Sequence, residues 1–173
     1  MGSHTSSFAA DVRGALDAFR RIVQTLRLSS RDAERRVGLS AAQLFALQQL
    51  AGMSGASVND LAARTFTHQS SVSVVVQRLV ARRLVAKAPA ADDRRRVRLS
   101  VTDAGRALLR RSPEPVQERL IAGIAALPAR ERRALVSALS AIADTLAVWD
   151  DAPPMLFEDG RARAAARPKR RAS

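Results

Sequence analysis

Apolar side chains recur at alternating intervals of four and three residues near both ends of the chain. The first stripe lies within residues 6–36 and the second within residues 103–150. This spacing places the apolar side chains on one helix face, which is typical of helices that associate along a narrow seam, although ordinary core helices share it. We predict helical dimerisation segments at 6–36 and 103–150, and hence a homodimer. The two stripes are Val12, Leu16, Phe19, Val23 and Leu26, and Leu135, Leu139, Ile142, Leu146 and Trp149.

Three shorter helical patterns follow the first stripe. Ser40 and Gln43 have the spacing of a capping box, which predicts a helix that begins after Ser40. Ser57 predicts a second, short helix, with Asp60 in its first turn where a carboxylate favours the helix dipole. A third helix is predicted from about residue 69 to 83. Its apolar stripe has helical spacing and comprises Val72, Val75, Val76 and Leu79.

The period changes from 3.6 to 2 after the third helix. Residues 84–88 and 97–101 read as two short strands joined by a polar turn, which predicts a β-hairpin with a charged tip. Thr102 then caps another helix, and Pro113 and Pro115 interrupt it before a last helix opened by Pro128. The predicted fold class is mostly α with a small two- or three-stranded β wing, in which residues 38–102 form a winged helix-turn-helix.

The charge of the chain favours a polyanionic partner. Lys and Arg number 29 against 16 Asp and Glu, a formal net charge of +13, and Lys87 and Lys169 are the only lysines. Arginine suits phosphate and base edges because its planar fork donates two parallel hydrogen bonds. No apolar run approaches membrane-spanning length and no signal-peptide pattern is present, so we expect a cytoplasmic protein that does not enter a membrane. Residues 151–173 form a basic tail, which is either a second phosphate-binding arm or a solubilising end.

The composition excludes several kinds of chemistry. The chain has no cysteine, which rules out disulfides, cysteine-ligated metals and thiol chemistry, and its two histidines, His4 and His68, are far apart. The sequence also has no Gly-rich phosphate loop and no evident pair of nucleophile and base. We therefore expect neither an enzyme nor a bound cofactor or metal.

The third helix and the hairpin tip carry the candidate contacts to double-stranded DNA. A helix that begins with small polar side chains can enter a major groove, and arginines on a protruding tip match the electronegative minor groove. Asp93 is acidic at this tip, so we assign it to orienting a neighbouring arginine. The predicted DNA contacts are Gln69, Ser70, Ser71, Ser73, Gln77, Arg78, Arg94, Arg95 and Arg96.

Several of these motifs resemble the MarR family of bacterial regulators. Asp93-Arg94-Arg95, an alternating strand, and then Thr102 and Gly105 are similar to the wing signature of that family. Further similarities, over roughly residues 10–150, are Gly38-Leu39-Ser40 before a helix, Leu61-Ala62, and Ser70-Ser71-Val72-Ser73 in the recognition helix. The resemblance implies a homodimeric regulator, most often a repressor, that binds a pseudo-palindromic operator. It also implies that a small aromatic or anionic effector modulates DNA binding.

The sequence departs from the family pattern at three places. Val74 stands where many relatives have arginine, Arg83 replaces a usual glycine, and His68 falls near the usual position of the helix cap. If the resemblance extends to an effector pocket, its walls are predicted to come from both the helical dimerisation segments and the winged helix-turn-helix. The candidates are Phe19, Arg20, Val23, Phe45, Met53, Arg106 and Leu109, with plain core positions as the alternative for the apolar ones. A sequence-nonspecific architectural DNA-binding protein is the alternative function.

Overall fold

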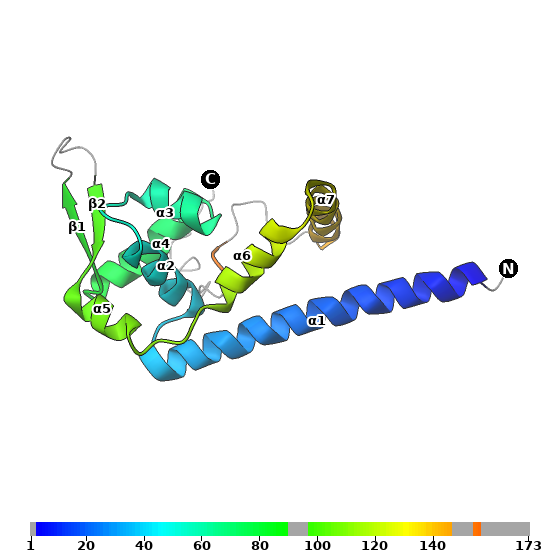
Figure 1. The fold of residues 1–173 in the computed structure, drawn as a ribbon, viewed down its shortest axis with the longest axis horizontal. Coiled ribbons are helices and arrows are strands. Elements are labelled where there is room, and N and C mark those ends of the chain that lie inside the picture. Colours follow the sequence, from blue (N-terminus) through cyan, green and yellow to red (C-terminus); the bar gives the residue numbers. More distant parts are fainter. Residues whose placement is uncertain (1–2, 90–96, 147–153, 157–173) are drawn as a thin grey trace, which may run out of the picture.

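The computed structural model describes residues 3–89, 97–146 and 154–156 of the chain. Within these residues it is mostly helical with one antiparallel two-stranded sheet, which confirms the predicted fold class (Figure 1). The elements are α1 (Ser3–Val37), α2 (Ala41–Ala51), α3 (Val58–Thr65), α4 (Gln69–Ala81), β1 (Val85–Pro89), β2 (Val97–Val101), α5 (Asp103–Leu109), α6 (Val116–Ala126) and α7 (Ala129–Thr145).

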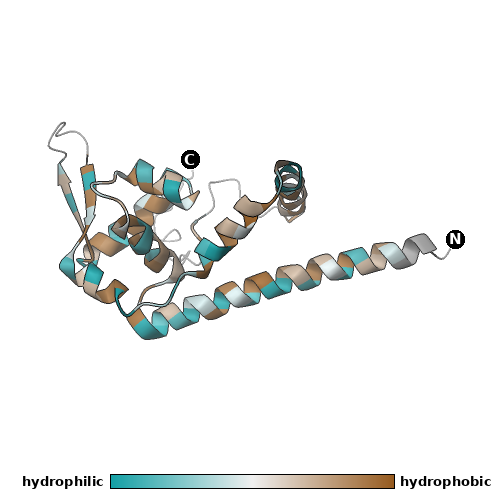
Figure 2. Ribbon diagram, viewed as in Figure 1, coloured by the Kyte–Doolittle hydropathy of each residue, from teal (hydrophilic) through white to brown (hydrophobic). Residues whose placement is uncertain are grey.

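Helix α1 is a single long rod whose N-terminal part extends away from the rest of the molecule (Figure 1). Along that part, apolar and polar residues alternate on the ribbon (Figure 2). Its predicted seam lies open in the single chain, since Val12, Leu16 and Phe19 are 43, 48 and 58% exposed, whereas Leu26 near the body is buried. Helix α7 is similar: none of its described residues is buried, and Ile142 is 58% exposed. Both seams are therefore left uncovered by the described part of the chain.

The core of the molecule is the compact unit formed by α2, α3, α4 and the sheet. Helix α2 is apolar on almost every side, which a helix tolerates when other elements surround it. Figure 2 shows the apolar segments of α2 and α4 together at the centre of this unit. Its fully buried side chains include Leu39, Leu44, Leu47, Leu50, Leu61, Val72, Val75, Val76, Leu79, Val85 and Leu99.

The helix starts follow from local hydrogen bonding. Asp60 and Ser57 form a complete capping box on α3, since the Ser57 Oγ accepts from the Asp60 N–H at 3.2 Å and the Asp60 carboxylate accepts from the Ser57 N–H at 2.8 Å. On α2 half of the predicted box forms. The Ser40 Oγ accepts from the Gln43 N–H at 3.2 Å, but the Gln43 Oε1 is buried with no partner among the described residues. The prediction of a reciprocal box at Ser40 and Gln43 was therefore wrong.

The sheet pairs β1 with β2 in the register Val85↔Val101 through Pro89↔Val97. Leu99 also bridges to Ala56, in the loop before α3, and its N–H donates to the Ala56 carbonyl at 2.7 Å. Ala56 therefore pairs with β2 through a single β-bridge, beside the two-stranded hairpin. The wing is thereby fixed to the helical unit at its base, where Leu99 is fully buried.

Candidate nucleic-acid interface

Helix α4 turns its apolar stripe to the core and a polar face outward. Val72, Val75, Val76 and Leu79 are fully buried, as the helical spacing predicts. The outward face carries most of the side chains that were predicted to contact DNA. Gln69, Ser70 and Gln77 are exposed, and Ser73 and Arg78 are half-buried.

Ser71 is the exception, because it is 5% exposed and belongs to the buried face. The reason is helical geometry: Ser71 lies four residues before Val75 and therefore sits above it on the same face. Ser71 therefore has much less surface to offer a DNA groove than Ser70 beside it. The three serines of this segment thus divide between a packing position and two outward positions.

The turn between α3 and α4 leaves the start of α4 accessible. Phe66 has φ 52°, in the left-handed region, and this conformation ends α3 and redirects the chain. His68 is the N-cap of α4 and is exposed, and among the described residues no side chain caps this helix. Thr67 instead donates its hydroxyl to the Thr65 carbonyl at 3.0 Å. Because the first turn of a helix has unsatisfied N–H groups and a positive dipole end, this terminus favours an anion.

The wing tip, with Asp93, Arg94, Arg95 and Arg96, lies outside the described residues. The structure does describe how the base of the wing is held. Arg98 on β2 donates from Nη1 to the Gly55 carbonyl at 2.6 Å, next to the bridge between Leu99 and Ala56. The base of the wing is thus fixed to the loop that leads into the helix-turn-helix.

Thr102 and Gly105 join the second strand to α5. The Thr102 hydroxyl donates to the Arg83 carbonyl at 2.8 Å and accepts from the Gly105 N–H at 3.1 Å. A Cβ on Gly105 would lie 2.4 Å from the Leu84 carbonyl oxygen, so the backbones approach too closely for a side chain. Arg83 has φ 58°, in the left-handed region that glycine adopts without strain. The Thr-x-x-Gly motif therefore holds the start of α5 tightly against the backbone at the base of the wing.

A series of side-chain hydrogen bonds links α3 and α2 of the helix-turn-helix to α6. Arg64 on α3 donates from Nε to the Gln49 Oε1 at 3.0 Å, and Gln49 on α2 donates from Nε2 to the Glu118 carboxylate at 3.3 Å. Gln48 donates to the Pro113 carbonyl at 3.1 Å, in the linker before α6. Gln49 is buried, so its two bonds fix the angle between the helices they join. Sequence reasoning missed this link, because the three residues are far apart in sequence and carry no recognisable motif.

The seven residues predicted to wall an effector pocket are not brought together in the single chain. Phe19, Arg20 and Val23 line a shallow exposed hollow on α1, and the Arg20 guanidinium is paired with Asp17 at 2.7 Å. Phe45 lines a cavity near the α3–α4 turn, and Leu109 lines another beside Gln48. Met53 packs against the core, and Arg106 is exposed on α5.

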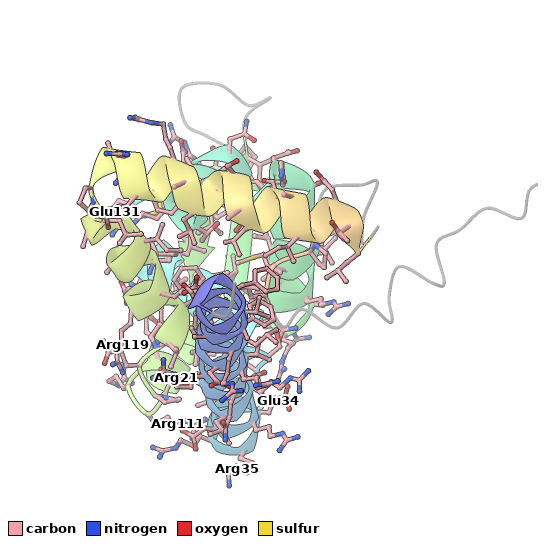
Figure 3. The ribbon with its side chains drawn as sticks, turned by 90° about the vertical axis from the view of Figure 1, so that its right-hand side faces the viewer. Arg21, Glu34, Arg35, Arg111, Arg119 and Glu131 are labelled. Atoms are coloured by element: carbon pink, nitrogen blue, oxygen red, sulfur yellow. The ribbon has the colours of Figure 1, made fainter. Side chains whose placement is uncertain are left out.

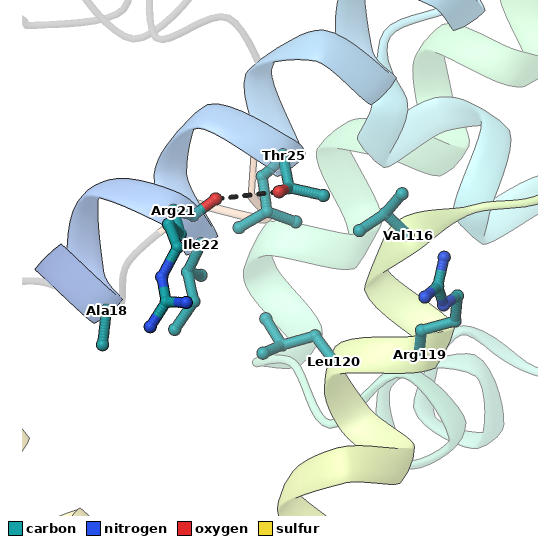
Figure 4. A pocket seen from close by; sticks show the side chains of 8 residues that line it. Ala18, Arg21, Ile22, Thr25, Val116, Arg119 and Leu120 are labelled. Carbon is teal, nitrogen blue, oxygen red and sulfur yellow. Dashed lines mark hydrogen bonds between the residues drawn. The ribbon is translucent and has the colours of Figure 1, made fainter.

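A different cavity, of about 470 Å³, lies between α1 and α6. Arg21 from α1 and Arg119 from α6 stand at opposite sides of it, and Ile22 and Leu120 give it an apolar wall (Figure 4). Thr25 is turned back to the Arg21 carbonyl at 2.8 Å, so its hydroxyl is already engaged. Figure 3 labels both arginines on the same side of that view. Two guanidinium groups around an apolar wall suit a flat, anionic molecule.

The described residues 3–89, 97–146 and 154–156 contain no group of three or more His, Asp or Glu side chains that could hold a metal ion. In the same part of the chain, no helix combines the length and the apolar character that crossing a bilayer requires.

These features together define a winged helix-turn-helix protein. Residues 37–96 match the model of the MarR family. The HTH-type transcriptional repressor MdtR of Bacillus subtilis (strain 168) is 31% identical over 96 residues, which are 56% of this chain and 60% of MdtR. The match thus spans about three fifths of the length of that relative. Over the matched residues the chain is similar to the MarR family, which its motifs resemble.

Solved structures give the same fold. BpsR of Bordetella bronchiseptica, whose DNA binding is regulated by 6-hydroxynicotinic acid, is 29% identical with a TM-score of 0.51 over 76% of this chain and 91% of BpsR. The transcriptional regulator BldR from Sulfolobus solfataricus is 21% identical with a TM-score of 0.50 over 84% of this chain and 99% of BldR, a likeness that supports the fold alone.

Proposed function

We propose that this chain is a homodimeric, sequence-specific regulator of transcription, most simply a repressor, that binds double-stranded DNA. The observation that carries the proposal is the outward polar face of α4, which sits beside an uncapped helix start and a wing fixed at its base. Ser70 and Gln69 are placed to meet base edges, and Arg78 to meet a phosphate. The wing arginines Arg94, Arg95 and Arg96, oriented by Asp93, would enter the adjacent minor groove.

Dimerisation follows from the two open seams. A helix face with Val12, Leu16 and Phe19 on α1, or with Ile142 on α7, is unfavourable in water and needs a partner surface. The same seams on a second copy supply that surface by symmetry. A dimer places two α4 helices on one duplex, which then reads two half-sites related by a two-fold axis. Residues 6–36 and 103–150 would form the dimerisation part, and residues 38–102 the reading head.

The experiment is selection of binding duplexes from a random DNA library with the full chain. We expect a pseudo-palindromic consensus whose half-sites are about one helical turn, roughly 10 base pairs, apart. Gel filtration with light scattering should give the mass of two chains. A selection that yields no consensus would support the architectural, nonspecific alternative, and a monomer would exclude the two-fold arrangement.

The cavity with Arg21 and Arg119 is the site we propose for a small effector, an aromatic carboxylic acid. BpsR, whose regulator 6-hydroxynicotinic acid belongs to this chemical class, supports the choice of probe. The two guanidinium groups would make the cavity attractive to the carboxylate, and Ile22 and Leu120 would cover the ring. Calorimetric titration with 6-hydroxynicotinic acid should show binding that Arg21→Gln and Arg119→Gln abolish. Arg111→Gln, outside the cavity lining, is the control, and equal binding by all three variants would reject this site.

A further inference from the structure

The cavity beside Gln48, of about 400 Å³, lies where α2, α3 and the start of α6 meet. It is separate from the cavity with Arg21 and Arg119, since the two share no lining residue. The proposed function gives this second cavity no task. Its polar lining comes from two residues of α2, one of α3, two of the linker between α5 and α6, and one of α6, namely Gln48, Gln49, Arg64, Ser112, Glu114 and Glu118.

Charges of opposite sign line this cavity without pairing with one another. Arg64 donates from Nε to the Gln49 Oε1 at 3.0 Å, and the Glu118 carboxylate accepts from the Gln49 Nε2 at 3.3 Å. Within the described part of the chain, no ion pair joins Arg64 or Glu118 to any other side chain. Gln49 is 8% exposed, so a buried amide stands between the guanidinium and the carboxylate. The cavity therefore presents a positive and a negative group, each with hydrogen-bonding capacity left over.

Gln48 adds an acceptor that lacks a donor. Its Nε2 donates to the Pro113 carbonyl at 3.1 Å, whereas its Oε1 is buried and has no partner among the described residues. A buried polar atom without a partner is uncommon, and a missing water or bound group is one explanation for it. The Gln48 side chain is half-buried in the cavity wall, so a small rotation of its amide would bring Oε1 to a donor bound there. Together with the carboxylates of Glu114 and Glu118, this oxygen favours a cationic donor.

We propose that this cavity binds a zwitterionic small molecule, a free α-amino acid. Its carboxylate would bind the Arg64 guanidinium. Its ammonium group would lie near the Glu114 and Glu118 carboxylates and donate to the Gln48 Oε1. The two carboxylates of the lining repel a simple anion, and Arg64 repels a simple amine, so the charge pattern favours a ligand that carries both charges. Leu109 offers apolar contact to a short side chain.

The experiment is a thermal-shift screen of the full chain with each of the common protein L-amino acids, without DNA. The amino acid with the largest shift is then titrated by calorimetry. Because Arg64, Glu114 and Glu118 are exposed, water screens their charges, and the ligand is therefore added at millimolar concentration. If none of the amino acids binds, the proposal is overturned.

Two derivatives of the same amino acid test the zwitterion. The N-acetyl derivative lacks the ammonium charge, and the carboxamide lacks the carboxylate. We expect each derivative to bind roughly tenfold more weakly than the parent, the loss that corresponds to one hydrogen bond to a charged group. A derivative that binds as well as the parent would show that the site takes a single charge, which contradicts the proposal.

Variants then assign each charge to its partner. Arg64→Gln should weaken binding of the amino acid but leave binding of the carboxamide unchanged, because the carboxamide has no carboxylate to lose. Glu114→Gln should likewise act on the amino acid and not on the N-acetyl derivative, and since Glu114 is exposed in the linker, its replacement leaves the packing in place. The matched controls, Arg110→Gln and Glu131→Gln, are exposed and outside the lining, and should bind as the original protein does.

A purely structural role gives a different result. If Arg64→Gln weakened the carboxamide as much as the amino acid, or if the controls lost as much binding as the cavity variants, the assignment of Arg64 and Glu114 would be overturned. Circular dichroism melting checks that every variant remains folded. Since all of these measurements are made without DNA, their failure leaves the proposed reading head untouched, and a failed operator selection leaves this site untouched.

Discussion

The backbone of α5 at Gly105 lies very close to the Leu84 carbonyl, just before β1. The variant Gly105→Ala therefore tests how tightly α5 packs against the base of the wing. The added Cβ would lie 2.4 Å from the Leu84 carbonyl oxygen and 2.7 Å from the Val101 Cγ1, where ordinary contacts begin near 3.4 Å. The helix must therefore move by about 1 Å, which is too large a shift for side-chain adjustment alone. The Leu84 carbonyl also accepts from the Thr102 N–H at 3.1 Å, so the movement strains that bond as well.

The magnitude follows from three contributions. Overpacking of a tight contact costs about 1–3 kcal/mol, and a weakened hydrogen bond costs up to about 1 kcal/mol. The higher helix propensity of alanine offsets this loss of stability by up to about 1 kcal/mol. We expect Gly105→Ala to lower the free energy of unfolding by about 2 kcal/mol, which corresponds to a fall in Tm of roughly 4–8 °C for a chain of this size.

The assay is urea denaturation at one fixed protomer concentration, because the stability of a dimer depends on concentration. Gly52→Ala is the matched control. Gly52 ends α2 at φ −85°, and a Cβ there would meet the Gln49 carbonyl oxygen at an ordinary 3.6 Å. This variant should match the original protein or exceed it by about 0.5 kcal/mol, because alanine restricts the unfolded chain. If Gly105→Ala proved as stable as Gly52→Ala, the close-packing explanation of the motif would be refuted.

Three further predictions concern the reading head. Arg95→Ala should weaken operator binding by about 1–3 kcal/mol at fixed salt in fluorescence anisotropy, and unchanged affinity would remove the wing from the interface. Ser70→Ala should alter the sequence preference in a competition assay, whereas Ser71→Ala, at the buried position, should leave it as it was; the reverse result would contradict the orientation of α4. Arg83→Gly should raise the free energy of unfolding by about 1 kcal/mol, because it relieves a left-handed residue at φ 58°, and a loss of stability would mean that the arginine makes a compensating contact.

Most of the fold could be predicted because its signals are local. The stripe on α4, the capping residues Ser57 and Thr102 and the interruption at Pro113 each depend on neighbours within one or two turns, and each is found in the structure. The orientations of Ser70 and Ser71 on α4 were harder to predict. Composition marked Ser70 and Ser71 alike as polar, but one residue corresponds to about 100° around a helix, which is enough to bury one and expose the other.

What the sequence left undetermined depends on contacts between distant segments. Arg21 and Arg119 line one cavity because α6 packs on α1, and no spacing rule links two positions nearly a hundred residues apart. The same holds for Met155, which reads as an ordinary apolar residue after two prolines and yet is buried. Family resemblance led instead to Phe19 and Phe45, which lie at different cavities in the single chain.

The hydrogen bonds of Gln49 offer a route by which binding of the proposed effector would change the affinity for DNA. In the proposed effector complex, a molecule held between Arg21 and Arg119 would draw α6 toward α1, and α6 carries Glu118 one residue before Arg119. Glu118 is bonded to Gln49, and Gln49 to Arg64 on the helix that precedes the recognition helix. A shift of α6 must therefore either break a buried bond or move α3, and in a dimer such a movement changes the distance between the two α4 helices. In the proposed dimer two half-sites are read together, so a small change in that distance would weaken binding at both.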